Sequence, residues 1–204
     1  NETDDRFYSR YYPRRLQAEV LLDAISQATG SPTKFPGKPA GTRALQLPDS
    51  SIASYFLETF GRPERSITCD CERSDEPSMV QVLHIMNGGT LNNKLSASDN
   101  RLSKLLAAKT PNAKLVEEAY LTALSRYPTA VEKKFILAVL ADADTKDSQL
   151  AIRLEQTFRE TLAREPTDEE RKKLLQATAG VEKRQAVEDL FWSILSSREF
   201  LFHR

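Results

Sequence analysis

The feature that most restricts the fold of this chain is a short pattern that occurs twice in its second half. Residues 124–129 read Leu-Ser-Arg-Tyr-Pro-Thr and residues 162–167 read Leu-Ala-Arg-Glu-Pro-Thr, an offset of 38 residues. In each copy a glutamate follows the threonine by three residues, the spacing of a capping box. In that motif the two side chains satisfy free N–H groups of the first helical turn. The pattern predicts a helix, a Pro-Thr corner and a capped helix, used twice.

The spacing of apolar residues along the rest of the chain is also helical. Between residues 110 and 204, apolar residues recur at three- and four-residue steps, as in amphipathic helices. Residues 1–109 carry shorter stretches of the same kind, separated by loops such as 31–48 that are rich in proline and glycine. We predict an all-α, multi-helix bundle with long proline-rich loops in the N-terminal half and a duplicated helical hairpin in the C-terminal half. The predicted helices of the first half run from near Pro13 to Gly30, from Ile52 to Phe60, from Val80 to Met86, and onward from a cap at Asp99.

The two halves, 1–109 and 110–204, are expected to form one compact domain. Repeats of this length also occur in helical solenoids that bind peptides. Two copies without a wider consensus favour a plain bundle.

The charge balance excludes one common class of function. Basic and acidic residues number 29 each, so the formal net charge is zero. This removes the usual electrostatic argument for binding nucleic acid or an anionic membrane surface. No apolar run approaches the roughly 20 residues that span a bilayer, so no membrane insertion is expected. One local cluster, with arginines at 10, 14 and 15 among tyrosines at 8, 11 and 12, fits either a nucleic-acid or sugar patch or a packed entry segment, and the net charge favours the second.

The only cysteines, Cys69 and Cys71, stand one residue apart in an irregular stretch. Three interpretations remain open. The two thiols form a short, strained and reducible disulfide; they bind a soft metal, although a structural zinc site needs four ligands and no second cysteine pair exists; or they are packing residues without chemistry. We expect no metal and no cofactor.

No catalytic pattern stands out elsewhere. The chain contains no phosphate loop, no HExxH string and no ordered Ser-His-Asp set. His84 falls on the apolar face of its predicted helix, where a lone histidine is usually a hydrogen-bonded core residue. His203 lies beside two phenylalanines at the end of the chain. The residues therefore favour a protein without catalytic activity.

Several strings together resemble a known family. They read PRRLQAEVLLDAI (13–25), YFLETFGRPER (55–65), CDCERS (69–74), LTALSRYPT (121–129) and WSILSSREFLF (192–202). In this order they resemble the C-terminal domain of unknown function of large exported planctomycete proteins. The resemblance implies a periplasmic or cell-surface location, with upstream domains of the same polypeptide, in some members a cytochrome-c-like domain, as partners. The second hairpin, roughly 145–178, departs from the family pattern as an insertion.

Two hypotheses for function follow. The first is a non-catalytic interaction or docking module of a larger exported bacterial protein. The alternative is a redox or catalytic domain that acts through Cys69 and Cys71 beside a haem-bearing partner. In either case we expect Arg62, Arg65 and Arg73 to order their loop, because arginine can satisfy several carbonyls and a carboxylate at once.

Overall fold

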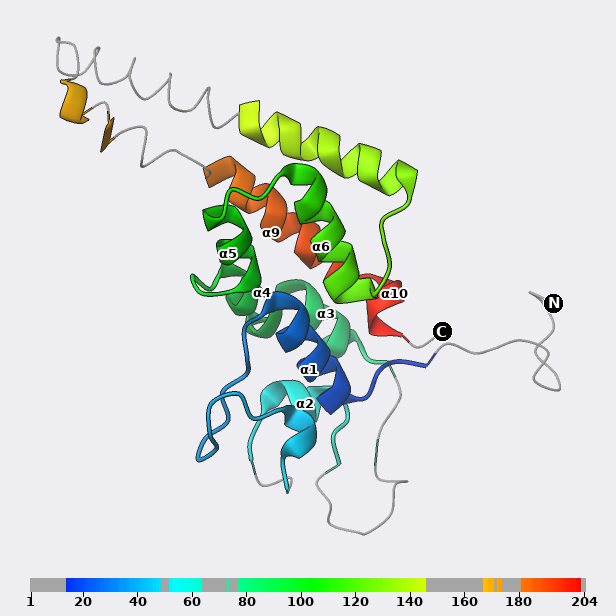
Figure 1. The fold of residues 1–204 in the computed structure, drawn as a ribbon. Helices are drawn as coiled ribbons and strands as arrows, with labels where there is room; N and C mark the ends of the chain where they lie inside the picture. The colour runs from blue at the N-terminus through cyan, green and yellow to red at the C-terminus, as the bar shows by residue number, and fades with distance from the viewer. Residues whose placement is uncertain are drawn as a thin grey trace, which may run out of the picture.

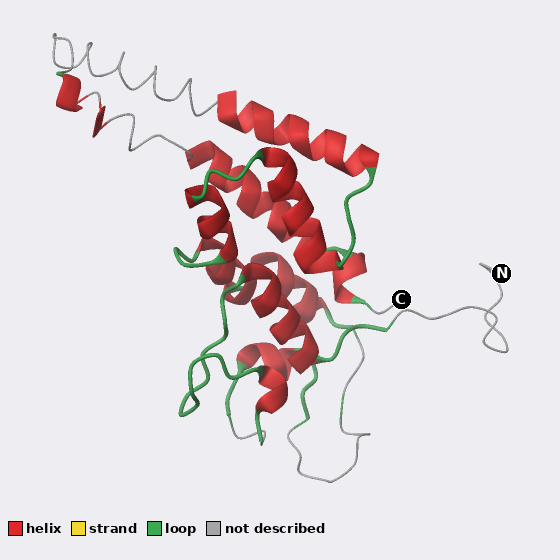
Figure 2. Ribbon diagram, in the orientation of Figure 1, coloured by secondary structure: helices red, strands yellow, loops and turns green. Residues whose placement is uncertain are grey.

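The computed structural model describes residues 14–48, 52–63, 73, 77–145, 167–170, 172–173 and 181–202. Within these ranges the regular elements are all helical and no strand is present (Figure 2). An isolated antiparallel bridge joins Arg15 to Phe202. The predicted all-α class is therefore confirmed for the part of the chain that the structure describes.

The labelled elements are α1 (Ala18–Thr29), the 3₁₀ turn η1 (Ala44–Gln46), α2 (Tyr55–Thr59), α3 (Met79–Asn87), α4 (Gly89–Ser96), α5 (Arg101–Ala107), α6 (Asn112–Leu124), α9 (Val181–Leu195) and α10 (Arg198–Leu201). A further helix covers residues 130–145 and is called the 130–145 helix below (Figure 1). From α3 to α6 the helices follow one another with short connections, whereas longer segments separate α1 from η1 and α2 from α3.

Two helices from opposite ends of the chain organise the core. Helix α1 packs against α2, α4, α5 and α6, whereas α9 packs against α4, α5, α6 and α10. Their apolar residues, such as Leu22 and Phe191, are buried in one continuous cluster. The two halves of the sequence thus share a single hydrophobic core.

Helix α1 begins later than the sequence predicted. It starts at Ala18 instead of near Pro13, because the preceding backbone is extended and pairs with the end of the chain. The amide of Leu16 donates to the carbonyl of Leu201 at 2.9 Å. The predicted stop at Gly30 is confirmed: this residue has φ +66° and its N–H caps the helix.

The proline-rich loop after α1 is anchored by a buried carboxylate. Asp23 accepts hydrogen bonds from the amides of Ala44 at 2.7 Å and Leu45 at 3.2 Å. The guanidinium of Arg43 lies 3.5 Å from the same carboxylate. These bonds hold η1 against α1 and satisfy a carboxylate that is only 8% exposed.

A second helix, α4, follows α3 after Gly88 and was not predicted. The cap of α5 is Asn100, so the prediction of Asp99 was wrong by one residue. Asn100 is fully buried; its Oδ1 accepts from the amide of Ser103 at 2.8 Å, and its Nδ2 donates to the carbonyls of Lys94 and Leu95 at 2.9 and 2.5 Å. An amide can do both tasks, whereas a carboxylate cannot donate.

Both predicted capping boxes form. The amide of Thr129 donates to Glu132 at 2.7 Å and the amide of Glu132 donates back to the threonine hydroxyl at 3.3 Å. The corresponding distances for Thr167 and Glu170 are 2.9 and 3.3 Å. Most of the hairpin around the second corner lies outside the described residues, so the duplication stays a prediction.

The first corner is tied to the end of the chain by Arg126. Its guanidinium bonds Glu132 at 2.9 and 3.0 Å and Glu199 of α10 at 2.8 and 2.9 Å. It also lies 5.1 Å from the centre of the Tyr120 ring. The hydrogen bonds from Arg126 lower the pKa of Glu132 to about 2. This cluster, here called the Arg126 clamp, links α6, the corner and α10.

Candidate functional site

The two cysteines that carried the redox hypothesis, Cys69 and Cys71, lie outside the described residues, as do Arg65 and His203. Arg73 and Arg62 are described. Arg73 bonds both oxygens of Glu19 on α1, at 2.8 and 3.2 Å, with the two side chains only 17% and 13% exposed. Burial raises the pKa of Glu19, but the hydrogen bonds and charge of Arg73 outweigh it and keep that pKa below its ordinary value.

Arg62 donates to the carbonyl of Ile52 at 3.4 Å. The partners of these two arginines thus include the Glu19 carboxylate and the Ile52 carbonyl. That all three arginines serve chiefly to order the loop stays a prediction.

His84 is surrounded by aromatic rings. Its Nε2 lies 3.0 Å from the hydroxyl of Thr90, and the rings of Tyr55, Phe56 and Phe60 lie 5.3 to 6.0 Å from its own. Burial lowers the pKa of His84, so this environment favours the neutral imidazole. Within the described ranges, no three His, Cys, Asp or Glu side chains are grouped so as to hold a metal ion.

The outward face of α3 is apolar. Its buried residues are Gln81 and Ile85. The Gln81 amide is satisfied inside, since Nε2 donates to the carbonyl of Thr59 at 3.0 Å and Oε1 accepts from the amide of Ser78 at 3.3 Å. The large apolar side chains of α3 instead face outward, each between 48% and 72% exposed: Met79, Val80, Val82, Leu83 and Met86.

A cavity of about 410 Å³ adjoins this face of α3. It is mainly apolar, and its charged lining residues in the described ranges are Arg15 and Arg198. Arg15 donates to the carbonyl of Phe60 at 3.0 Å and lies 5.3 Å from the centre of the Phe60 ring. Trp192 is only partly buried and lines this cavity. The five outward residues of α3 and this cavity are called the α3 surface.

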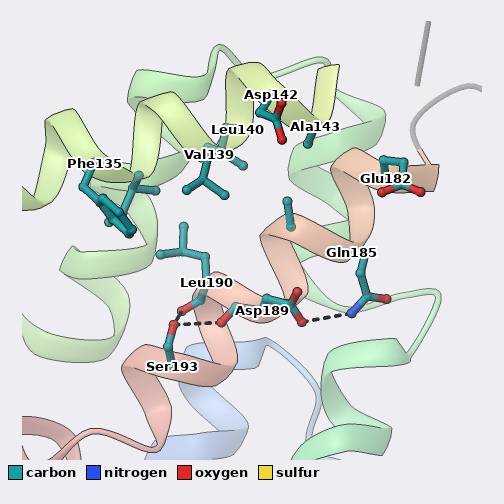
Figure 3. A pocket seen from close by; sticks show the side chains of 12 residues that line it. Phe135, Val139, Leu140, Asp142, Ala143, Glu182, Gln185, Asp189, Leu190 and Ser193 are labelled. Carbon is teal, nitrogen blue, oxygen red and sulfur yellow. Dashed lines mark hydrogen bonds between the residues drawn. The ribbon is translucent and has the colours of Figure 1, made fainter. Parts of the chain in front are cut away.

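A second hollow of about 320 Å³ lies between the 130–145 helix and α9 and is called the α9 groove (Figure 3). Its polar side is acidic, and no lysine or arginine is among its described lining residues. Gln185 donates to Asp189 at 2.9 Å, and the hydroxyl of Ser193 donates to the Asp189 carbonyl at 2.8 Å. The apolar floor consists of Phe135, Ile136, Val139, Leu140, Ala186 and Leu190, and the acids are Asp142, Glu182 and Asp189.

Neither surface was identified from the sequence. For α3 the sequence did contain an indication, because six of its nine residues have large apolar side chains. This is more than the buried stripe of an amphipathic helix of that length requires, so some must be exposed. For the groove, the residues come from two helices that are distant in sequence, and only their packing brings them together. Among the helices that the structure describes, none is both long and apolar enough to cross a bilayer.

The arrangement offers two apolar surfaces of opposite charge and, in the described ranges, no catalytic cluster. Comparisons with curated proteins and with solved structures gave no match. One family matches: PSD1, a protein of unknown function (DUF1553), over residues 1–140. This range is shorter than the resemblance suggested, since it stops before α9. It covers more than half of the 204 residues, and the chain therefore belongs to the PSD1 (DUF1553) family, whose members typically occur in planctomycete proteins with cytochrome-c-like domains.

Proposed function

We propose that this domain is a non-catalytic docking module of a larger exported bacterial protein, and that its α3 surface receives a helix from the upstream part of the same polypeptide. The observation that carries the proposal is that α3 exposes most of its large apolar side chains to solvent while it buries the polar Gln81. Five large apolar side chains face outward on a helix of nine residues, beside an apolar cavity. Contiguous exposed apolar surface of this kind marks interaction sites in soluble proteins.

The spacing on α3 suits a helical partner. Met79, Val82, Leu83 and Met86 follow one another at steps of three, one and three residues, which places them along one stripe. A partner helix would lay its own apolar stripe against this one, with a large side chain in the cavity. Arg15 and Arg198 at the cavity favour a partner with carboxylates near its anchoring side chain.

The path of the chain supports a partner on the same polypeptide. Arg15, which precedes α1 in the chain, lines the cavity. Any domain upstream is therefore tethered through a segment that leaves from the edge of the α3 surface. A short tether raises the effective concentration of the partner to about the millimolar range, so that even a weak contact is occupied.

The test is calorimetric titration of the 204-residue chain with the separately expressed upstream domains. Replacing both Val82 and Leu83 by serine should weaken binding by about tenfold or more, because the central apolar contacts are lost. Both side chains are about half exposed, so the fold should persist. Leu45→Ser is the matched control, since Leu45 is exposed on η1, outside the α3 surface and the α9 groove, and this variant should bind normally. Failure of the unmodified chain to bind, or equal binding by the double variant, would contradict the proposal.

The redox alternative rests on Cys69 and Cys71 and stays a prediction. A thiol titration of the native protein before and after mild reduction checks it. Two newly reactive thiols after reduction would indicate a reversible disulfide, and an unchanged count would argue against one.

A further inference from the structure

We infer that the α9 groove is a second interaction surface and that its partner is a basic amphipathic helix. This inference is independent of the proposed role of the α3 surface, because the two surfaces share no residue. It rests on three properties of the groove: an exposed apolar stripe, a rim with one sign of charge, and walls formed by two helices (Figure 3).

The apolar stripe belongs to the 130–145 helix. Val131, Phe135 and Val139 follow at four-residue steps and are 79%, 71% and 43% exposed. Phe135 and Val139 also line the groove, whereas Leu140 beneath them is fully buried. The apolar surface of this helix thus extends from the core to the solvent-facing side, where a helix usually presents polar side chains. A phenylalanine exposed to this degree is a typical anchor for a partner.

The charge of the rim selects the partner. Asp142 comes from one wall, and Glu182 and Asp189 come from the other. Figure 3 shows Asp142 on the 130–145 helix and Glu182 and Asp189 on α9. Asp189 is exposed and receives the Gln185 amide on one oxygen, and a carboxylate can accept further donors. Lysine or arginine side chains that flank an apolar stripe would therefore lie next to carboxylates on both walls.

The walls favour a helical partner over an extended one. An extended peptide is usually bound by adding to a sheet edge, and the described residues contain no strand. A helix can pack in the furrow between two helices at axial distances of about 8–10 Å. From Phe135 to Ala143 the wall rises by eight residue steps, roughly 12 Å at 1.5 Å per residue, which suits two or three turns of a partner.

The two surfaces of this domain therefore discriminate between partners by charge. The α3 surface has Arg15 and Arg198 beside its apolar residues, and the α9 groove has three acids. A helix with basic flanks meets like charges at the first and opposite charges at the second. Like-charge contacts are an effective way to reject a wrong partner.

The experiment uses the 204-residue chain and two synthetic peptides of about 14 residues, long enough for four helical turns. Both carry leucine at helical three- and four-residue spacing; one has lysine at the flanking positions and the other has glutamate. Binding is followed by fluorescence anisotropy. A labelled lysine peptide should bind with a Kd of about 10 µM, and unlabelled glutamate peptide, whose charge suits the α3 surface instead, should displace it at least tenfold less effectively than unlabelled lysine peptide.

Three variants locate the binding site. Phe135→Ser and, separately, Asp189→Asn should each weaken the lysine peptide by about fivefold or more. Asp189→Asn should also reduce the dependence of binding on salt, since one charge contact is lost. Leu83→Ser on the α3 surface is the matched control and should leave binding unchanged. The inference is overturned if the lysine peptide does not bind, if both unlabelled peptides displace it equally, or if Leu83→Ser weakens its binding as much as the groove variants do.

Discussion

The junction of α1, α4 and α5 and the Arg126 clamp hold the fold together in different ways. At the junction, Asp23, Lys94 and Asn100 are all at least 92% buried, and each bonds backbone groups of another segment. In the clamp, Arg126 and its two glutamates form a network with good geometry, but each side chain is 24–33% exposed. Both regions join elements that are far apart in sequence.

The difference in burial decides the energetic importance of each region. A polar group inside the core that loses its partner is cut off from water and costs about 1–3 kcal/mol, and more if it is charged. A partly exposed ion pair exchanges its partner for water at a cost of about 0–1 kcal/mol. The bonds of the clamp join full charges, yet the junction is expected to contribute more to stability because its polar groups are buried. The following substitutions test that ranking.

The largest effect is expected for Asn100→Ala. It removes three hydrogen bonds and leaves the carbonyls of Lys94 and Leu95 and the amide of Ser103 without this partner. The free energy of unfolding should fall by about 3 kcal/mol in urea denaturation. The control is Asp99→Ala: this neighbour is exposed and should change stability by less than about 0.5 kcal/mol. Equal effects at the two positions would refute the assignment of the cap.

Arg73→Ala tests an ion pair of intermediate burial. Glu19 would keep its buried carboxylate without the guanidinium, and the free energy of unfolding should fall by about 2 kcal/mol. The Glu19 pKa is lowered in the folded protein. This contribution is therefore present above the unfolded pKa and is lost as the pH falls through the folded value. The difference between wild type and variant, measured by denaturation, should shrink in acid; a difference that is constant with pH would contradict this account.

Lys94 makes the junction sensitive to alkaline pH. Burial lowers its pKa to about 8, against the opposing attraction of Asp23, while its ammonium donates to the carbonyl of Ser31 at 2.5 Å. Between that value and the ordinary pKa of 10.5, the unfolded chain binds more protons than the folded one. Stability from this group should rise by about 1 kcal/mol between pH 7 and about pH 9. Lys94→Met should lack that increment in thermal unfolding; parallel pH profiles would show that Lys94 is not responsible.

The smallest effect is expected at the clamp. Glu199→Gln keeps the shape of the side chain but removes its charge opposite Arg126, and should lower the free energy of unfolding by about 0.5 kcal/mol. The loss should diminish further in about 1 M salt, where the Debye length is about 3 Å. A loss as large as that of Asn100→Ala would reverse the comparison, and would mean that the clamp acts as one cooperative network.

The predictions were correct where a feature depends on residues close together in the sequence, and wrong where it depends on residues far apart. The stop of α1 at Gly30 and the capping boxes at Thr129 and Thr167 were correct, because each depends on residues within one turn of one another. The start of α1 and the identity of the α5 cap were wrong. The first depends on pairing with residues near Phe202, and the second depends on the last carbonyls of α4, a helix that was not predicted.

The sequence alone determined the class of this fold, the capping boxes at Thr129 and Thr167 and its membership of the PSD1 family, because helical periodicity, capping spacing and family strings are local patterns. The tertiary structure decided which polar groups are buried and which apolar groups face outward. Asp23 meets Ala44 across 21 positions, Arg73 meets Glu19 across 54, and Lys94 meets Ser31 across 63. The same helical pattern of α3 is compatible with either face inward. Whether a side chain is buried depends on the residues that pack around it, and these residues are distant in sequence.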